Sequence, residues 1–126
     1  MRIIIAGSRT IEVDYDHMLD LLWEVDLYFM GKVKFTEVVC GEAKGVDKSG
    51  RLFAEEHGLT VKSFPADWDK YGKGAGHIRN KQMADYSDAL LLIWDGSSKG
   101  SANMKATMLK LNKPVYEVII GDTNEI

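Results

Sequence analysis

The run Ile3-Ile4-Ile5-Ala6-Gly7-Ser8-Arg9 decides the fold class, because a continuously apolar segment passes directly into a glycine-containing turn. Strands that are buried on both faces of a sheet require apolar side chains at successive positions, not only at alternate ones. The runs 38–40 and 89–94 are also continuously apolar. With two further runs rich in β-branched and apolar residues, the sequence predicts five strands, at residues 3–6, 36–40, 60–63, 89–94 and 115–120.

Segments long enough for helices separate these strands, at residues 15–30, 46–57, 78–86 and 101–111. Gly58 follows the second segment as a left-handed cap would, and Asn112-Lys113-Pro114 ends the fourth before the last strand. The repeated strand-helix order predicts a single Rossmann-like α/β domain over residues 1–126, with a mainly parallel five-stranded sheet and helices on both faces. Because crossovers between parallel strands are right-handed, the expected strand order is 3-2-1-4-5.

The composition is that of an ordinary soluble domain, with 126 residues, of which 45% are hydrophobic and 28% are charged. The net charge of −3 argues against a surface that neutralises a nucleic-acid backbone, but it is compatible with small anions as ligands. The single cysteine, Cys40, excludes an internal disulfide and favours the cytoplasm. The N-terminal apolar run is too short for a signal peptide, and no stretch reaches the roughly 20 apolar residues of a membrane span. Residues 121–126 are expected to form a loose tail.

Three of the predicted strands run directly into glycine-containing loops that are expected to meet at one edge of the sheet. A phosphate is bound by converging backbone N–H groups at a helix N-terminus, and glycine allows a close approach and a positive φ. We expect a phosphate site made by these loops and by the residues that follow them, with Gly100 at a positive φ. The candidate residues are Gly7, Ser8, Arg9, Gly41, Glu42, Ala43, Gly45, Val46, Asp47, Asp95, Gly96, Gly100 and Ser101.

The segment 64–80 is long for an α/β connection and rich in glycine, aromatic and charged residues, so it is interpreted as a binding loop or a mobile lid. Arg79 and Asn80 are expected to begin the third helix, where a guanidinium can hold a phosphate through two parallel hydrogen bonds. Asp67 and Trp68 complete the candidate ligand-binding residues. Trp68 and Tyr71 either stack on a base or anchor the loop.

Five motifs occur in order along the chain: Gly7-Ser8-Arg9, Gly41-Glu42-Ala43-Lys44-Gly45-Val46-Asp47, Phe64-Pro65-Ala66-Asp67-Trp68, Gly76-His77-Ile78-Arg79-Asn80 and Gly100-Ser101-Ala102-Asn103-Met104. Together they resemble the SLOG superfamily, and specifically its YspA/cpYpsA-related branch, in family order between Ile3 and about Val118. The second motif corresponds to the family pattern GGARGAD and the fifth to GTAxM. Glu42 departs from the pattern, since it replaces a glycine and adds a negative charge. Asp95-Gly96-Ser97-Ser98 also departs from the proline and glycines often found there.

The resemblance implies a module that binds or senses a nucleotide or nucleotide-derived ligand. The superfamily includes the Lonely Guy phosphoribohydrolases, so hydrolysis of an N-glycosidic bond is the alternative, with Arg79 as the candidate catalytic arginine. The expected glutamate is replaced by Asn103-Met104, and another carboxylate would have to act: Glu42, Asp47, Asp67, Asp69 or Asp95. The Rossmann domain of DprA suggests single-stranded DNA as a third ligand, against which the acidic net charge argues.

The remaining candidate residues predict no metal site and no cofactor. His17, His57 and His77 lack the spacing of metal ligands, although His77 is close enough to Arg79 in sequence to contact a ligand. Cys40, at the end of an apolar strand, is interpreted as a small buried residue and not as a nucleophile.

The first helix carries apolar residues on more than one face, which indicates either a wide core face or a surface for self-association. We expect a homodimer interface, because the apolar residues exceed what one face of a sheet can cover. These residues are Trp23, Leu27, Tyr28, Phe29 and Met30.

Overall fold

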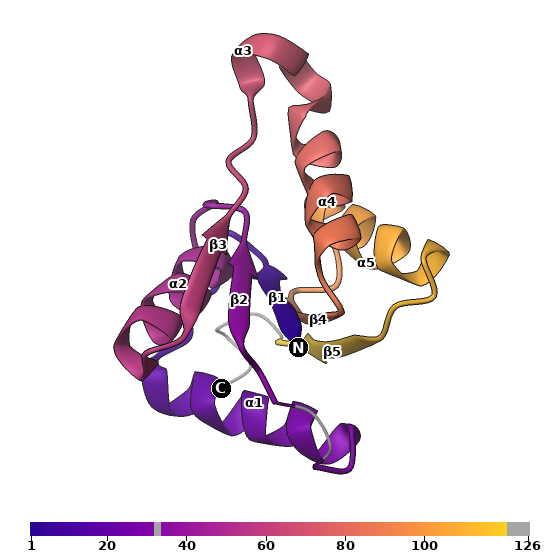
Figure 1. Cartoon of the computed structure of the whole chain (residues 1–126). Coiled ribbons are helices and arrows are strands. Elements are labelled where there is room, and N and C mark those ends of the chain that lie inside the picture. Colours follow the sequence, from indigo (N-terminus) through magenta and orange to yellow (C-terminus); the bar gives the residue numbers. More distant parts are fainter. Residues whose placement is uncertain (32–33, 121–126) are drawn as a thin grey trace.

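The sheet consists of five parallel strands in the order β3-β2-β1-β4-β5 (Figure 1), in a computed structural model that describes residues 1–31 and 34–120. The α/β fold and the strand order predicted from the sequence are confirmed. The predicted tail, 121–126, lies outside the described residues. The strands are β1 (Arg2–Gly7), β2 (Glu37–Cys40), β3 (Thr60–Ser63), β4 (Ala89–Trp94) and β5 (Val115–Ile119).

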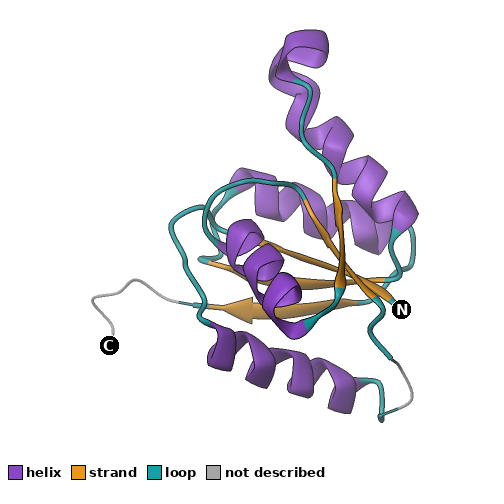
Figure 2. Cartoon of the chain, turned by 60° about the vertical axis from the view of Figure 1, so that its left-hand side comes forward, coloured by secondary structure: helices purple, strands orange, loops and turns teal. Residues whose placement is uncertain are grey.

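Helical segments connect the strands and cover both faces of the sheet (Figure 2). None of the helices among the described residues combines the length and the apolar character needed to cross a membrane. The segments are α1 (Tyr15–Tyr28), α2 (Val46–His57), α3 (Trp68–Tyr71), the 3₁₀ turn η1 (Gly72–Gly74), α4 (Ala75–Tyr86) and α5 (Lys99–Lys110).

Strand β1 at the centre of the sheet separates two apolar cores. Ile3 and Ile5 are fully buried in the core that α1 and α2 cover. Ile4 and Ala6 point to the opposite face, into the core that α4 and α5 cover. Because successive side chains of a strand point to opposite faces, burial on both faces requires the unbroken apolar run seen in the sequence.

The parallel pairing brings the carboxyl ends of the central strands together. Gly7 at the end of β1 pairs with Ile93 of β4, and the next N–H group, that of Ser8, donates to the Ile93 carbonyl at 3.1 Å. From β1 the chain adds β2 and β3 on one side of the sheet and then β4 and β5 on the other side. Accordingly, α2 packs on one face of the sheet and α4 on the opposite face. Ligands of open α/β sheets bind where the strand order reverses in this way, outside the carboxyl ends of the strands.

Two expectations about the helices were wrong. The first helix ends at Tyr28, because Met30 adopts a positive φ of 61° and Gly31 one of 68°, which the right-handed helix cannot accommodate. The segment 64–80 is mostly helical, and α4 already begins at Ala75. Ala75 is buried, and its packing stabilises a helical turn that the neighbouring glycines disfavour. Figure 1 shows α3 and the beginning of α4 extending away from the sheet.

Candidate functional site

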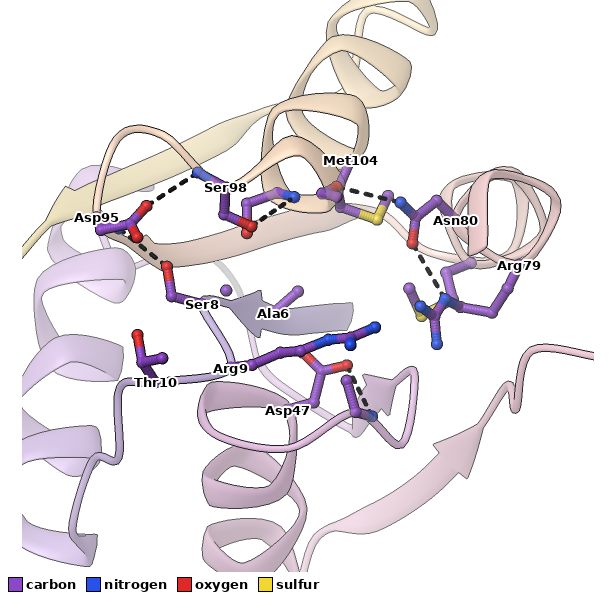
Figure 3. Close-up of a pocket in the computed structure, with 15 residues that line it drawn as sticks. Ala6, Ser8, Arg9, Thr10, Asp47, Arg79, Asn80, Asp95, Ser98 and Met104 are labelled. Carbon is purple, nitrogen blue, oxygen red and sulfur yellow. Dashed lines mark hydrogen bonds between the residues drawn. The ribbon is translucent and has the colours of Figure 1, made fainter. Parts of the chain in front are cut away.

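A cavity of about 370 Å³ lies over the carboxyl ends of β1 and β4 (Figure 3). Loops that are far apart in the sequence form its walls, as the positions of the three glycine-containing segments predicted. Ten of the predicted residues line it: Gly7, Ser8, Arg9, Ala43, Asp47, Arg79, Asn80, Asp95, Gly100 and Ser101.

The turn after β1 holds two walls of the cavity together. Gly7 cannot be replaced without moving the sheet, because a Cβ atom there would lie 1.7 Å from the Ile93 carbonyl oxygen. Ser8 is buried, and its Oγ accepts a hydrogen bond of 3.0 Å from the backbone N–H of Asp95. The first and fourth loops are therefore fixed to one another by backbone contact and by one hydroxyl group.

Asp47, in the first turn of α2, places a buried carboxylate beside the cavity. Its Oδ2 accepts a hydrogen bond of 3.3 Å from the N–H of Ala43, and the N–H groups of Gly7 and Gly41 also stabilise the carboxylate. Burial nevertheless raises the pKa of Asp47, because it outweighs these hydrogen bonds and the charge of Arg79. The Asp47 side chain thus occupies backbone N–H donors of the second loop. The sequence interpretation had assigned these donors to a phosphate.

Gly45 and Glu42 shape this second loop through their backbone conformations. Gly45 precedes α2 with a φ of 71°, and a Cβ atom there would lie 2.4 Å from the carbonyl oxygen of Ser8. Glu42 has a φ of 61°, a conformation that glycine adopts at much lower cost. This positive φ is the reason that glycine would suit position 42, where the quoted family pattern has a glycine. Glu42 therefore occupies a strained position.

Asp95, at the fourth loop, shapes the entry to α5. Its Oδ1 accepts hydrogen bonds from the N–H groups of Ser97, at 2.9 Å, and Ser98, at 3.0 Å. These two donors are the main reason that the pKa of Asp95 lies below its ordinary value. Asp95 is exposed and its Oδ1 is already engaged, so its first role is to hold the turn.

The N-terminus of α5 provides free donors at the cavity wall. Ser98 is the N-cap, and its Oγ accepts from the N–H of Ser101 at 3.5 Å. Within the described part of the chain, the N–H groups of Lys99 and Gly100 have no protein acceptor, as is usual in a first helical turn. These groups and the helix dipole favour an anion at this end of the helix.

The expectation of a positive φ at Gly100 was wrong. Gly100 is the second residue of α5 and is not among the residues with positive φ. A Cβ atom there would meet no heavy atom within 4 Å. The reason is that the helix begins two residues earlier than predicted, so the conformation that glycine favours lies instead at Gly96, whose φ is 87°.

Arg79 lies in the second turn of α4, and its guanidinium is held on two sides. Its Nη1 donates to the carbonyl oxygen of Gly41, and its Nε donates to Oδ1 of Asn80 at 3.1 Å. Asn80 is buried, and its Nδ2 donates to the carbonyl oxygen of Gly100 at 3.3 Å and to Asn103 at 3.0 Å. A guanidinium has five N–H donors, so three remain for a ligand. Asn80 positions Arg79 against α5.

Arg9, in the turn after β1, is the second cation at the cavity. Within residues 1–31 and 34–120 it makes no side-chain hydrogen bond or ion pair. Figure 3 shows the Arg9 side chain extending toward Arg79, close to Asp47. Burial lowers the pKa of Arg79, and the positive charge of Arg9 lowers it further. Two like charges that approach one another beside free N–H groups form an environment that favours an anion.

A smaller cavity of about 180 Å³ adjoins the first and shares Arg9, Ala43 and Arg79 with it. Gly41, Glu42 and Trp68 from the predicted set line this smaller cavity and not the larger one. The remaining predicted residues line neither cavity and have structural roles: Gly45 begins α2, Val46 is fully buried, Asp67 caps α3 through the N–H of Lys70, and Gly96 forms the turn after Asp95.

Five residues of the larger cavity were not predicted: Ala6, Thr10, Met83, Ser98 and Met104. Met83 and Met104 belong to the core between α4, α5 and the sheet, and helical periodicity alone marks them only as core residues. Ser98 could have been found, because a serine that precedes a helical segment signals an N-cap.

Cys40 and His77, two further candidates from the sequence, add no chemistry to the larger cavity. Cys40 is fully buried, and burial raises the pKa of its thiol, as expected of a structural cysteine. His77 is exposed and does not line the larger cavity. Among the described residues there is no group of three or more His, Cys, Asp or Glu side chains that could hold a metal ion.

The fold and the cavity together define a Rossmann-like α/β protein with a pocket at the switch point of its sheet, lined by two arginines and two aspartates. Comparisons of the chain with models of protein families, with curated proteins and with solved structures found no match.

Proposed function

We propose that this protein binds or senses a nucleotide or nucleotide-derived ligand, with the ligand phosphate at the N-terminus of α5. The observation that carries the proposal is that Arg9 and Arg79 line the same cavity as Gly100, whose N–H group has no acceptor among the described residues. A phosphate between the two guanidinium groups offsets their repulsion and accepts hydrogen bonds from the helix. The resemblance of the sequence motifs to the YspA/cpYpsA-related branch of the SLOG superfamily supports the same ligand class.

Calorimetric titration with a nucleoside monophosphate tests this proposal. Replacing Arg79 by Ala removes charge-assisted hydrogen bonds of about 1.5 to 3 kcal/mol each, so the affinity should fall about tenfold to a hundredfold per bond. Arg79→Lys should give an intermediate affinity, because lysine keeps the charge but lacks the planar fork. Arg51→Ala is the matched control, since Arg51 lies on α2 and lines neither cavity.

The nucleoside without phosphate completes the test. It should bind the parent protein and Arg79→Ala equally weakly, because the contact that the substitution removes is made to the phosphate. A nucleotide that binds Arg79→Ala as tightly as the parent would contradict the proposed phosphate site.

Hydrolysis of an N-glycosidic bond is the second candidate function, and Asp47 is the observation that favours it. Among the described residues, Asp47 is the one buried carboxylate that lines the larger cavity, and burial raises its pKa, as in groups that transfer protons. Such a carboxylate could accept a proton from the water that replaces the base. Release of free base from a nucleoside monophosphate, lost in Asp47→Asn while binding persists, would establish this activity.

We further propose a cytoplasmic homodimer. Trp23 and Leu27 on α1 and Met30 in the turn after it are apolar side chains that are 63%, 69% and 77% exposed. An apolar pocket of about 280 Å³, lined by Leu22 and Phe53 among others, lies beside Trp23. Exposed apolar side chains next to an apolar pocket are self-complementary across a twofold axis, since each copy can fill the pocket of the other. The buried, unpaired Cys40 fits a reducing compartment.

A further inference from the structure

The smaller cavity, which Arg9, Glu42, Pro65, Trp68 and Arg79 help to form, is too small for a whole nucleotide. Its volume of about 180 Å³ lies below the range of about 300 to 1,000 Å³ typical of ligand pockets. It shares the two arginines with the larger cavity. A ligand whose phosphate lies in the larger cavity can therefore extend a further group into the smaller one.

Trp68 supplies a flat apolar surface at this cavity. It is 52% exposed although it is a large aromatic residue, and it lies in α3, which contains no buried residue. The backbone that carries Trp68 is held by Asp67, which caps α3 by accepting a hydrogen bond of 3.1 Å from the Lys70 N–H. A Cβ atom at Gly76 would lie 3.5 Å from the tip of the indole and 4.0 Å from Nη2 of Arg79. The indole thus lies beside the same glycine as the phosphate-binding guanidinium, and it can stack on a planar ring.

Glu42 supplies the polar recognition. It is exposed, and the described residues include no hydrogen bond or ion pair that engages its carboxylate. The chain holds it at a φ of 61°, a conformation that glycine would adopt without strain. A carboxylate accepts two parallel hydrogen bonds from a group with two adjacent N–H donors.

We propose that the smaller cavity is a nucleobase subsite that stacks a purine on Trp68 and selects guanine through two N–H groups donating to Glu42. Guanine presents N1–H and the 2-amino group side by side. Adenine presents an amino group beside the N1 lone pair, which a carboxylate repels, and hypoxanthine presents N1–H alone. This inference rests on the proposed function, since the phosphate must first anchor the nucleotide in the larger cavity.

Calorimetric titration with GMP, IMP, AMP and ribose 5-phosphate tests the subsite. GMP should bind about tenfold to a hundredfold tighter than AMP, with IMP between them. Glu42→Gln should weaken GMP at least about tenfold and reduce its preference over AMP, while ribose 5-phosphate affinity stays unchanged. Trp68→Leu should weaken all three nucleotides and spare ribose 5-phosphate, because stacking involves only the base.

A control variant separates local from general effects. Glu56→Gln makes the same chemical change on α2, away from both cavities. It should bind GMP like the parent. Equal affinity of the parent for GMP and AMP would overturn the subsite, and so would equal weakening of all nucleotides in Glu42→Gln. In either case, binding of ribose 5-phosphate would still support the phosphate site. If neither ribose 5-phosphate nor any nucleotide binds the parent, the proposed function fails and the subsite with it.

Discussion

Replacing Gly41 by Ala should displace the Arg79 guanidinium without removing its charge. A Cβ atom at position 41 would lie 2.5 Å from Nη1 of Arg79 and 3.0 Å from Oδ2 of Asp47. Ordinary van der Waals contact begins at 3.4 Å, so Nη1 must move by about 0.9 Å. Gly41 is not among the residues with positive φ, so alanine fits its backbone conformation.

The displacement should affect binding far more than stability. Overpacking costs about 1 to 3 kcal/mol, and the end of an arginine side chain moves readily, so the fold should persist with a modest decrease in the melting temperature. A shift of almost 1 Å breaks a hydrogen bond from Arg79 to the phosphate, worth about 1.5 to 3 kcal/mol. Nucleotide affinity should therefore decrease about tenfold to a hundredfold.

A double-mutant cycle, measured by calorimetry, provides the decisive assay. In the Arg79→Ala background, Gly41→Ala should cost almost no further affinity, because the group that it displaces is already absent. Gly74→Ala is the matched control, since a Cβ atom at that glycine would meet nothing within 4 Å. Additive losses of affinity from the two substitutions, or unchanged affinity in Gly41→Ala, would refute the reasoning.

The other predictions concern the cavity carboxylate, the α5 terminus and the exposed face of α1. Burial raises the pKa of Asp47, so its stabilising contribution is complete below the unfolded pKa and is lost as the pH rises through the folded pKa. In urea denaturation, the stability of Asp47→Asn relative to the parent should therefore increase with pH; a constant difference would contradict this. Gly100→Ala should raise the free energy of unfolding by about 0.5 to 1 kcal/mol, because alanine is favoured over glycine inside a helix. The same substitution should weaken nucleotide binding. A lower melting temperature would argue against the helical conformation of Gly100. Trp23→Ser should convert a dimer to a monomer by light scattering, and a parent that is monomeric at high micromolar concentration would exclude the dimer.

The strand order and the position of the site could be predicted from local patterns. The runs 3–6 and 89–94 are apolar at successive positions, a pattern that only strands buried on both faces require. The crossover rule then favours the order 3-2-1-4-5, which the structure has. Because adjacent parallel strands end at the same edge, the loops after them had to meet, and ten of the predicted residues line one cavity there.

The chemistry within that cavity depends on contacts that no local pattern contains. The sequence offered five alternative carboxylates, and only the packed structure distinguishes buried Asp47 from Asp95, whose Oδ1 already accepts two backbone N–H groups. It is also the tertiary structure that brings Arg9 of the first loop toward Arg79 of α4. Periodicity and turn propensity describe neighbours in the chain, whereas burial, charge proximity and free N–H groups arise from segments that meet only when the sheet and its helices pack.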